Sequence, residues 1–151
     1  MNKILVFGAN KKNQKYERTI KKQATKIAEI LKIKNAVIDI FLIGDGQMRA
    51  INKKFRGKNK PTNILSFVEP EKFPHPELKA GKNSSQKFMG EIYLNIGKIN
   101  DFTGSKKHLK LNELLIHGLL HLLGYIHNTK NDRMKMEKKE ETALGKLIFK
   151  K

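Results

Sequence analysis

The chain of 151 residues is long enough for one domain with a single hydrophobic core, and its 38% of hydrophobic residues excludes a wholly disordered chain. Its 32 Lys and Arg against 14 Asp and Glu give a net charge of +18, which favours a polyanionic partner such as nucleic acid. The absence of Cys excludes disulfides, cysteine ligands for zinc and a thiol nucleophile, and no run approaches the roughly 18 apolar residues of a membrane span.

Strands and helices alternate in the first half of the chain. Lys3–Phe7 is a short apolar run that predicts a strand. In Lys11–Leu31 apolar residues recur every three or four positions, which predicts one amphipathic helix. Ala36–Ile43 predicts a buried strand, Asp45 is the candidate N-cap of the next helix, and Gly57 marks where that helix ends.

The second half contains two more predicted strands and two longer helices. Ile64–Val68 and Met89–Ile96 predict the strands, and the stretch Glu69–Lys87 between them, which contains Pro and Gly, predicts a loop. Leu109–Leu123 is apolar nearly all round, which predicts a buried helix. A last helix is expected over Lys130–Phe149.

Together these elements predict a single-domain α+β fold over residues 1–151, because short strands are mixed with helices and we find no repeat or second domain. The expected architecture is a small four-stranded mixed sheet packed with four to five helices. The chain starts with too short an apolar run for a signal peptide, so we expect a cytoplasmic protein with no membrane partner.

The densest run of positive charge is Arg49–Lys60, which holds six cations and no carboxylate. Arg56, Lys53, Lys54 and Lys58 are therefore candidate RNA-binding residues. A solvated helix face is the more common explanation of such a run taken alone, and the sequence leaves both explanations open.

Three histidines form the most informative pattern. His117 and His121 are four residues apart, so on a helix their side chains lie on one face. Gly124 can adopt a left-handed conformation that turns the chain back, and His127 can then approach the same point. Three imidazoles would fill three positions of a tetrahedral ion and leave the fourth for water, as in catalytic zinc sites.

A shared ion also explains three imidazoles in and beside a Leu-rich helix, where each unmet hydrogen bond would cost roughly 1–3 kcal/mol. The predicted cofactor is one divalent metal ion at the end of the buried helix, with Zn²⁺ expected first and Ni, Co or Cu as alternatives. His75 and His108 are assigned no role.

The same spacing is similar to the zinc-peptidase motif HExxHxxGxxH. In that motif the residue after the first His is the Glu that activates water, whereas this chain has Gly118. A peptidase working by that mechanism would therefore lack its base.

Two blocks carry a resemblance to a known family. His117–His127 matches H-G-x-L-H-L-x-G-Y-D-H, except that Ile126 replaces Asp. Asn52–Gly57 matches N-x-x-F-R-G, and Pro61–Phe67 matches P-T-D-V-L-S-F except that Asn63 replaces Asp and Ile64 replaces Val. In these blocks the chain resembles the YbeY family of bacterial endoribonucleases that mature ribosomal RNA.

The resemblance implies a single-domain α+β fold, a zinc-like ion on His117, His121 and His127, and cleavage of single-stranded RNA near the 3′ end of small-subunit ribosomal RNA. It also implies that Arg56 and His117 are catalytic. A guanidinium can hold a phosphate through two parallel hydrogen bonds, which agrees with that role for Arg56.

The departures from the family signature lower the negative charge near the ion. Ile126 removes a candidate partner of His127, and Asn63 keeps a polar group without its charge. Weaker metal affinity or a changed rate is expected from both.

The leading hypothesis is a metal-dependent, single-strand-specific endoribonuclease in 16S rRNA 3′-end maturation and ribosome biogenesis, with ribosomal RNA and the small ribosomal subunit as partners. One alternative is a non-catalytic ribosome-assembly or RNA-binding factor with a structural metal. A zinc peptidase is the other.

Overall fold

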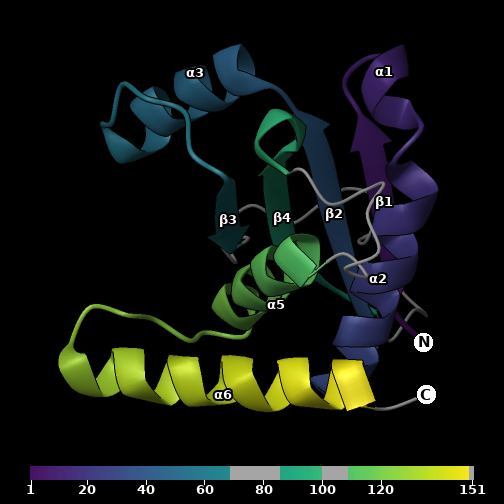
Figure 1. Ribbon diagram of the computed structural model, residues 1–151, viewed down its shortest axis with the longest axis vertical. Helices are drawn as coiled ribbons and strands as arrows, with labels where there is room; N and C mark the ends of the chain where they lie inside the picture. The colour runs from purple at the N-terminus through teal and green to yellow at the C-terminus, as the bar shows by residue number, and fades with distance from the viewer. Residues whose placement is uncertain (69–85, 100–108, 150–151) are drawn as a thin grey trace.

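A computed structural model describes residues 1–68, 86–99 and 109–149, and the strands in it form one mixed sheet in the order β1-β2-β4-β3 (Figure 1). The parallel strands are β1 (Lys3–Gly8), β2 (Ala36–Ile43) and β4 (Lys87–Asn95), whereas β3 (Ile64–Val68) runs antiparallel to β4. The four-stranded mixed sheet is therefore confirmed. The predicted loop lies outside the described residues except for Gln86 and Lys87, and Lys87 already belongs to β4.

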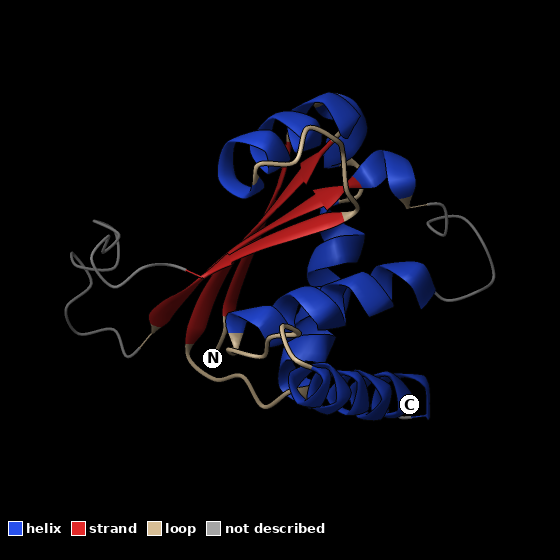
Figure 2. Cartoon of the chain, turned by 90° about the vertical axis from the view of Figure 1, so that its left-hand side faces the viewer, coloured by secondary structure: helices blue, strands red, loops and turns tan. Residues whose placement is uncertain are grey.

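Helices cover mainly one face of this sheet. α2 (Glu17–Ile30) packs on β1, and α5 (Leu109–Leu122) packs on β3 and β4. α6 (Lys130–Phe149) lies across α2 and α5 on their outer side, and α3 (Asp45–Arg56) lies at the end of the sheet to which the parallel strands point (Figures 1 and 2). With the short α1 (Lys11–Gln14), the described residues form five α-helices, as expected, and η1 (Ile96–Lys98) is a single 3₁₀ turn.

The prediction of one helix over Lys11–Leu31 was wrong, because the chain bends between α1 and α2. The amide group of Asn13 is buried and donates to the carbonyl oxygen of Leu42 in β2, at 3.1 Å. Glu17 accepts a 2.8 Å hydrogen bond from the backbone N–H of Gly8. These two contacts fasten the bend to the sheet, and apolar periodicity alone does not register them.

The prediction that Asp45 is the N-cap of α3 was wrong. Gly44 occupies the cap position, and Asp45 is the first helical residue. Its carboxylate accepts a 2.6 Å hydrogen bond from Asn95 Nδ2 at the end of β4, which draws the side chain away from the helix end. Gly57 ends the helix with φ of 71°, as predicted.

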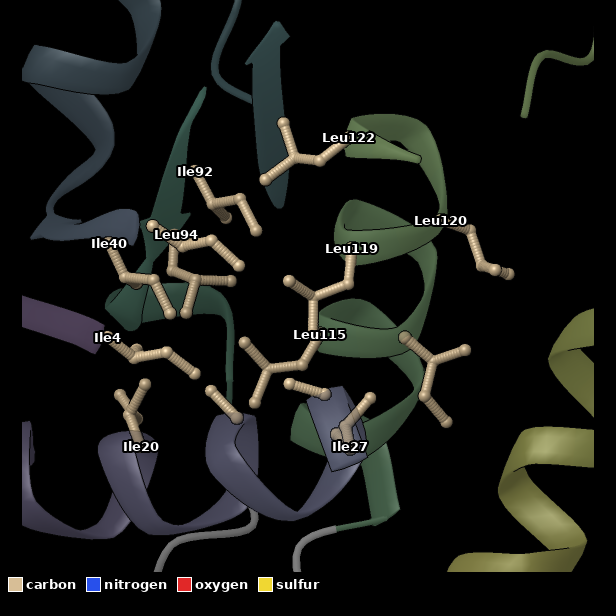
Figure 3. Close-up of a cluster of buried hydrophobic side chains, with 14 of the residues drawn as sticks. Ile4, Ile20, Ile27, Ile40, Ile92, Leu94, Leu115, Leu119, Leu120 and Leu122 are labelled. Carbon is tan, nitrogen blue, oxygen red and sulfur yellow. The ribbon is translucent and has the colours of Figure 1, made fainter. Parts of the chain in front are cut away.

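The hydrophobic core lies between the sheet and the pair α2 and α5 (Figure 3). α5 is apolar on both sides because the sheet covers one side and α6 covers the other. This confirms the predicted buried helix. The large side chains that are almost completely buried in this core include Ile20, Ile27, Ile38, Ile40, Leu42, Ile92, Leu94, Leu111, Leu115, Ile116 and Leu119.

Gly118 allows α5 to approach the sheet closely. A Cβ atom at this position would lie 2.9 Å from Ile64 Cδ1, 3.2 Å from Ile92 Cδ1 and 3.2 Å from Ser66 Oγ. These three side chains belong to β3 and β4, so the helix backbone rests almost directly on the sheet. The residue just before Gly118 is thereby held in a fixed place beside β3.

Candidate metal centre

Two histidine rings face each other near the end of α5. His117 and His121 lie four residues apart on the helix, and their Nε2 atoms are 3.1 Å apart. Two nitrogen ligands of a tetrahedral zinc ion, with bonds of about 2.0–2.1 Å, lie about 3.3 Å apart. The separation of the two nitrogens is therefore close to one edge of such a coordination shell.

The Nδ1 atoms of both rings have oxygen partners. His121 Nδ1 lies 3.0 Å from the carbonyl oxygen of Tyr125, and His117 Nδ1 lies 2.9 Å from Glu140 Oε2. Carbonyl and carboxylate oxygens only accept, so each Nδ1 carries a proton, and in a neutral ring the Nε2 atom then presents its lone pair. Two lone pairs that face each other at 3.1 Å favour a cation between them.

The turn after α5 supplies both the carbonyl group that holds His121 and the third histidine. Gly124 has φ of 101°, and the Tyr125 N–H donates to the carbonyl oxygen of Leu120 at 3.0 Å. This is the hydrogen bond of a Schellman motif and confirms the predicted turn at Gly124. The ring centroid of His127 then lies 5.6 and 4.9 Å from those of the two helical histidines.

His117, His121 and His127 each offer one ligand atom, and the three atoms lie within 4.8 Å of one another. The two helical rings are half-buried and His127 is exposed. Three imidazoles are a suitable donor set for zinc and related borderline ions, so the residues present fit a divalent metal ion. The structure therefore places the three predicted ligands in position to bind one ion.

The surroundings favour the neutral form of His121. Burial lowers the pKa of this ring from its usual value of 6.5, and the neighbouring His117 and His127 lower it further. The Tyr125 carbonyl group and Glu140 act in the opposite direction. Because only the neutral ring binds a cation, the net shift keeps His121 available as a ligand near neutral pH.

Glu140 contacts a predicted metal ligand, and the motif alone assigned it no role. α6 buries Met136 and Ala143 against the rest of the core, and Glu140 lies one helical turn after Met136 on the same face. The side chains of His117 and Glu140 are 32% and 29% exposed, so the contact is partly shielded from water. A carboxylate inside an apolar helix face is the signal that marks this residue in the sequence.

Position 118, where zinc peptidases carry their catalytic Glu, faces the sheet. A side chain on Gly118 would start within 3.2 Å of atoms of Ile64, Ile92 and Ser66. It would therefore collide with the sheet. The peptidase alternative lacks both the residue and the room for it.

Arg56 lies at the end of α3, beside the edge strand β3. Its Nη2 donates to the carbonyl oxygen of Ser66 at 2.9 Å, and its guanidinium carbon lies 5.0 Å from the centre of the Phe67 ring. No hydrogen bond within the described ranges joins Arg56 to the three histidines. β3 connects them instead, because Ser66 Oγ faces Gly118 on α5.

The predicted RNA-binding lysines are all exposed near Arg56. They are Lys53, Lys54 and Lys58, and the ammonium of Lys54 lies 5.3 Å from the centre of the Phe55 ring. Their contact with RNA stays a prediction. The buried Asn52, which sequence reasoning treated only as part of a motif, donates to the carbonyl oxygen of Lys60 at 2.8 Å and fastens the segment after α3.

The two departures from the family signature lie in different surroundings. Ile126 is 48% exposed beside His127, so the change from Asp removes a charge at the surface of the cluster. Asn63 accepts a 2.9 Å hydrogen bond from the Asn95 N–H through its backbone oxygen, which any residue can provide. His75 and His108 lie outside the described residues. Over the described ranges, no helix has the length and apolar character needed to cross a lipid bilayer.

The fold and the cluster define a small α+β protein with three histidines positioned for one metal ion at the end of a buried helix. Residues 7–148 match the family model described as Endoribonuclease YbeY. The chain belongs to this family, which supports a role as an endoribonuclease and confirms the resemblance seen in the sequence.

Several relatives with the same description are similar over much of their length. The chain is 38% identical over 117 residues to Endoribonuclease YbeY of Thermodesulfovibrio yellowstonii, covering 74% of this chain and 67% of that protein. It is 36% identical over 155 residues to that of Bartonella henselae, covering 97% and 92%. The solution structure of TM1509 from Thermotoga maritima matches with a TM-score of 0.51 at 26% identity, covering 96% of this chain and 91% of that one.

Proposed function

We propose that the protein is a metal-dependent endoribonuclease that cuts single-stranded RNA in the 3′-end maturation of small-subunit ribosomal RNA. The observation that carries this proposal is the pair of Nε2 atoms 3.1 Å apart, whose rings are fixed through Nδ1 by Glu140 and by the Tyr125 carbonyl group. Family membership supports the nuclease reaction, and the net charge of +18 supports a polyanionic substrate.

The residues of the cluster prepare a site for a divalent ion. His117, His121 and His127 would hold it, with Zn²⁺ expected from the imidazole ligands. When bound, such an ion would polarise a phosphoryl oxygen and lower the pKa of a water molecule. Glu140 keeps the proton of His117 on Nδ1, which leaves Nε2 free as a ligand.

Arg56 would hold the phosphate group. One of its donors is used on Ser66, which fixes the plane of the guanidinium, and the side chain is otherwise exposed. A fixed, charged fork of donors offsets negative charge that grows on a phosphate during cleavage. Lys53, Lys54 and Lys58 would add contacts to neighbouring phosphates. Ribosomal RNA and the small subunit are the proposed partners, and the cytoplasm is the proposed compartment.

A cleavage assay tests this function. Metal-free protein, protein reloaded with Zn²⁺ and reloaded protein with excess chelator are incubated with a single strand that copies the 3′ region of the precursor. We expect cleavage only in the reloaded sample. Arg56→Lys should lower the rate about a hundredfold, because Lys lacks the planar fork, and Arg49→Lys on the same helix should leave it unchanged. Folded, metal-loaded protein that cuts no single strand would refute the proposal.

A further inference from the structure

Five aromatic rings form a continuous line across the sheet. Phe7 of β1 pairs with Phe41 of β2, and Phe41 pairs with Tyr93 of β4. The line continues through Phe67 of β3 to Phe55 of α3. Successive ring centroids along this line lie 5.3, 4.9, 5.7 and 5.3 Å apart. Each of the four strands contributes one ring.

This aromatic line (Phe7, Phe41, Tyr93, Phe67 and Phe55) lies on the face that α2 and α5 leave uncovered. Side chains alternate between the two faces of a strand, and the neighbours of Phe41 and Tyr93 in β2 and β4 are fully buried under those helices. The rings at the two ends are the most accessible, with Phe7 44% and Phe55 57% exposed. Figure 2 shows the sheet from the side, with α6 and the helices on which it packs on one side only.

Cations border both ends of the aromatic line. At the first end, a groove of about 670 Å³ lies between the outer edge of β1 and α2, and Phe7 forms part of its wall. Four cations line this groove, namely Arg18, Lys21, Lys22 and Lys26. Its carboxylate, Glu17, accepts a hydrogen bond from the Gly8 N–H. The groove is therefore basic and has an exposed aromatic ring.

At the other end, the cations lie against the rings themselves. Lys54 Nζ is 5.3 Å from the centre of the Phe55 ring, and the guanidinium of Arg56 is 5.0 Å from that of Phe67. The middle of the aromatic line is acidic instead. Asp39 of β2 and Glu91 of β4 lie opposite each other in the register of the sheet, on the same face as the line. Phosphates are thus expected beside the two ends, where the cations lie, and not beside the two carboxylates.

We infer that the face of the sheet opposite α2 and α5 is a binding surface for single-stranded RNA, with bases stacked on Phe7 and Phe55 and phosphates held by the two basic ends. Aromatic rings combined with cations are typical of proteins that bind single strands, because every base has a face that can stack. The exposed ring of Phe7 beside these cations favours RNA over an acidic peptide, because a base can stack on the ring while its phosphate meets the cations. This inference rests on the proposed function for the identity of the ligand.

The surface would also direct the strand towards the candidate metal centre. The aromatic line and α5 lie on opposite faces of the sheet, and they meet at the edge strand β3. Ser66 points its side chain to α5, whereas the next residue, Phe67, belongs to the aromatic line. Arg56 contacts both residues, so a strand that leaves the face of the aromatic line at this edge passes the arginine first.

Binding without cleavage tests the inference. Metal-free protein in excess chelator is titrated into a labelled 12-nucleotide RNA, single-stranded or paired with its complement, and fluorescence anisotropy gives the affinity. Phe7→Ala should weaken single-strand binding about tenfold and leave duplex binding unchanged, because stacking contributes only to the single strand. Phe7→Leu keeps an apolar side chain without the ring, so it should weaken single-strand binding by the same factor. It takes the place of the alanine variant if that variant does not fold. Met134→Ala, at another exposed apolar residue, which lies on α6, should bind like the unmodified protein.

The salt dependence tests the basic groove separately. Lys21→Gln with Lys22→Gln should lower the slope of log affinity against log salt concentration by about 1.4, because each phosphate contact to a single strand contributes about 0.7. Lys135→Gln with Lys138→Gln removes the same charge from α6 and should leave the slope unchanged. An equal decrease of the slope in both double variants would overturn the inference, since binding would then follow net charge alone.

Phe7→Trp provides a direct signal, because the chain contains no other Trp. Its fluorescence should be quenched by single-stranded RNA and not by polyglutamate at equal ionic strength. Quenching by polyglutamate would assign the groove to an acidic polypeptide and overturn the inference. If the cleavage assay fails while Phe7→Leu still weakens RNA binding, only the proposed nuclease function falls. If cleavage succeeds and Phe7→Leu binds normally, only the binding surface falls.

Discussion

Glu140 accepts a hydrogen bond from His117 Nδ1 at 2.9 Å, so the last helix of the chain sets the orientation of a candidate metal ligand on α5. The two residues are 23 positions apart in the sequence, and they meet because α6 packs along α5. Burial of Met136 and Ala143 fixes the rotation of α6. The geometry of the metal centre therefore depends on helix packing as well as on the histidine motif.

Glu140→Gln is expected to weaken metal binding, and Glu140→Ala to weaken it further. Gln still accepts a hydrogen bond from His117 but carries no charge, whereas Ala removes both. Loss of such a partner lowers metal affinity by about 10–100-fold. Competition with a chromophoric chelator measures the affinity. Glu137→Gln, at an exposed position on α6, serves as the comparison, and an equal loss in that variant would contradict the role of Glu140.

Metal binding should also raise thermal stability. An ion that binds the folded chain and not the unfolded chain shifts the equilibrium towards folding, so Tm should rise as Zn²⁺ is added and fall when it is chelated. Mass spectrometry under native conditions should find one ion per chain. His121→Ala should abolish both the bound ion and the shift in Tm. A shift that persists in this variant would mean that the ion binds elsewhere.

The order of the helices and strands was predictable from the sequence, because the patterns that indicate each element are local. The strand Ala36–Ile43 and the helix Lys130–Phe149 have the bounds that their patterns predicted. Local patterns failed where a polar side chain bonds to a distant element. The amide of Asn13 bonds to β2 and bends a predicted helix, and Asp45 bonds to Asn95 instead of capping α3.

The candidate site was predictable only in part, for the same reason. The spacing of His117, His121 and His127 encodes their convergence, since a helix and one glycine turn suffice to bring them together. The partner of His117 was not predictable, because Glu140 reaches it through the packing of two helices. The aromatic line was equally hidden, since residues on four strands become neighbours only through the register of the sheet.

Tyr93 should give the folded protein a distinct response to alkaline pH. Burial raises the pKa of its hydroxyl group to about 12, and the nearby Glu91, which accepts its hydrogen bond, adds to the shift. Since the pKa is higher in the folded chain than the ordinary value of 10.0, folding favours the protonated phenol. The stability that Tyr93 contributes is present in full below about pH 10 and is lost as the pH rises towards 12.

Ultraviolet absorbance of tyrosinate measures this titration. Of the three tyrosines, Tyr93 should ionise at about pH 12, and Tyr93→Phe should remove that step from the curve. The variant should also lose less stability than the unmodified protein between pH 10 and 12. An unchanged curve in Tyr93→Phe would refute the assignment.

Gly118→Ala and Gly145→Ala are expected to change stability in opposite directions. Both glycines lie inside helices, where Ala is intrinsically favoured by about 1 kcal/mol. At Gly145 nothing lies within 4 Å of an added Cβ, so the substitution should raise the free energy of unfolding by roughly 0.5–1 kcal/mol. At Gly118 the added Cβ would lie 2.9 Å from Ile64 Cδ1, and crowding of this kind costs about 1–3 kcal/mol.

Urea unfolding of the metal-free variants measures the two free energies without a contribution from the ion. We expect a net loss for Gly118→Ala, because α5 must move away from β3 to make room for the methyl group. That movement would also displace His117, so the same variant should bind Zn²⁺ more weakly, whereas Gly145→Ala should bind it normally. A stabilised Gly118→Ala with unchanged affinity would show that α5 does not rest on the sheet at this point, and the position of the metal centre beside β3 would then be wrong.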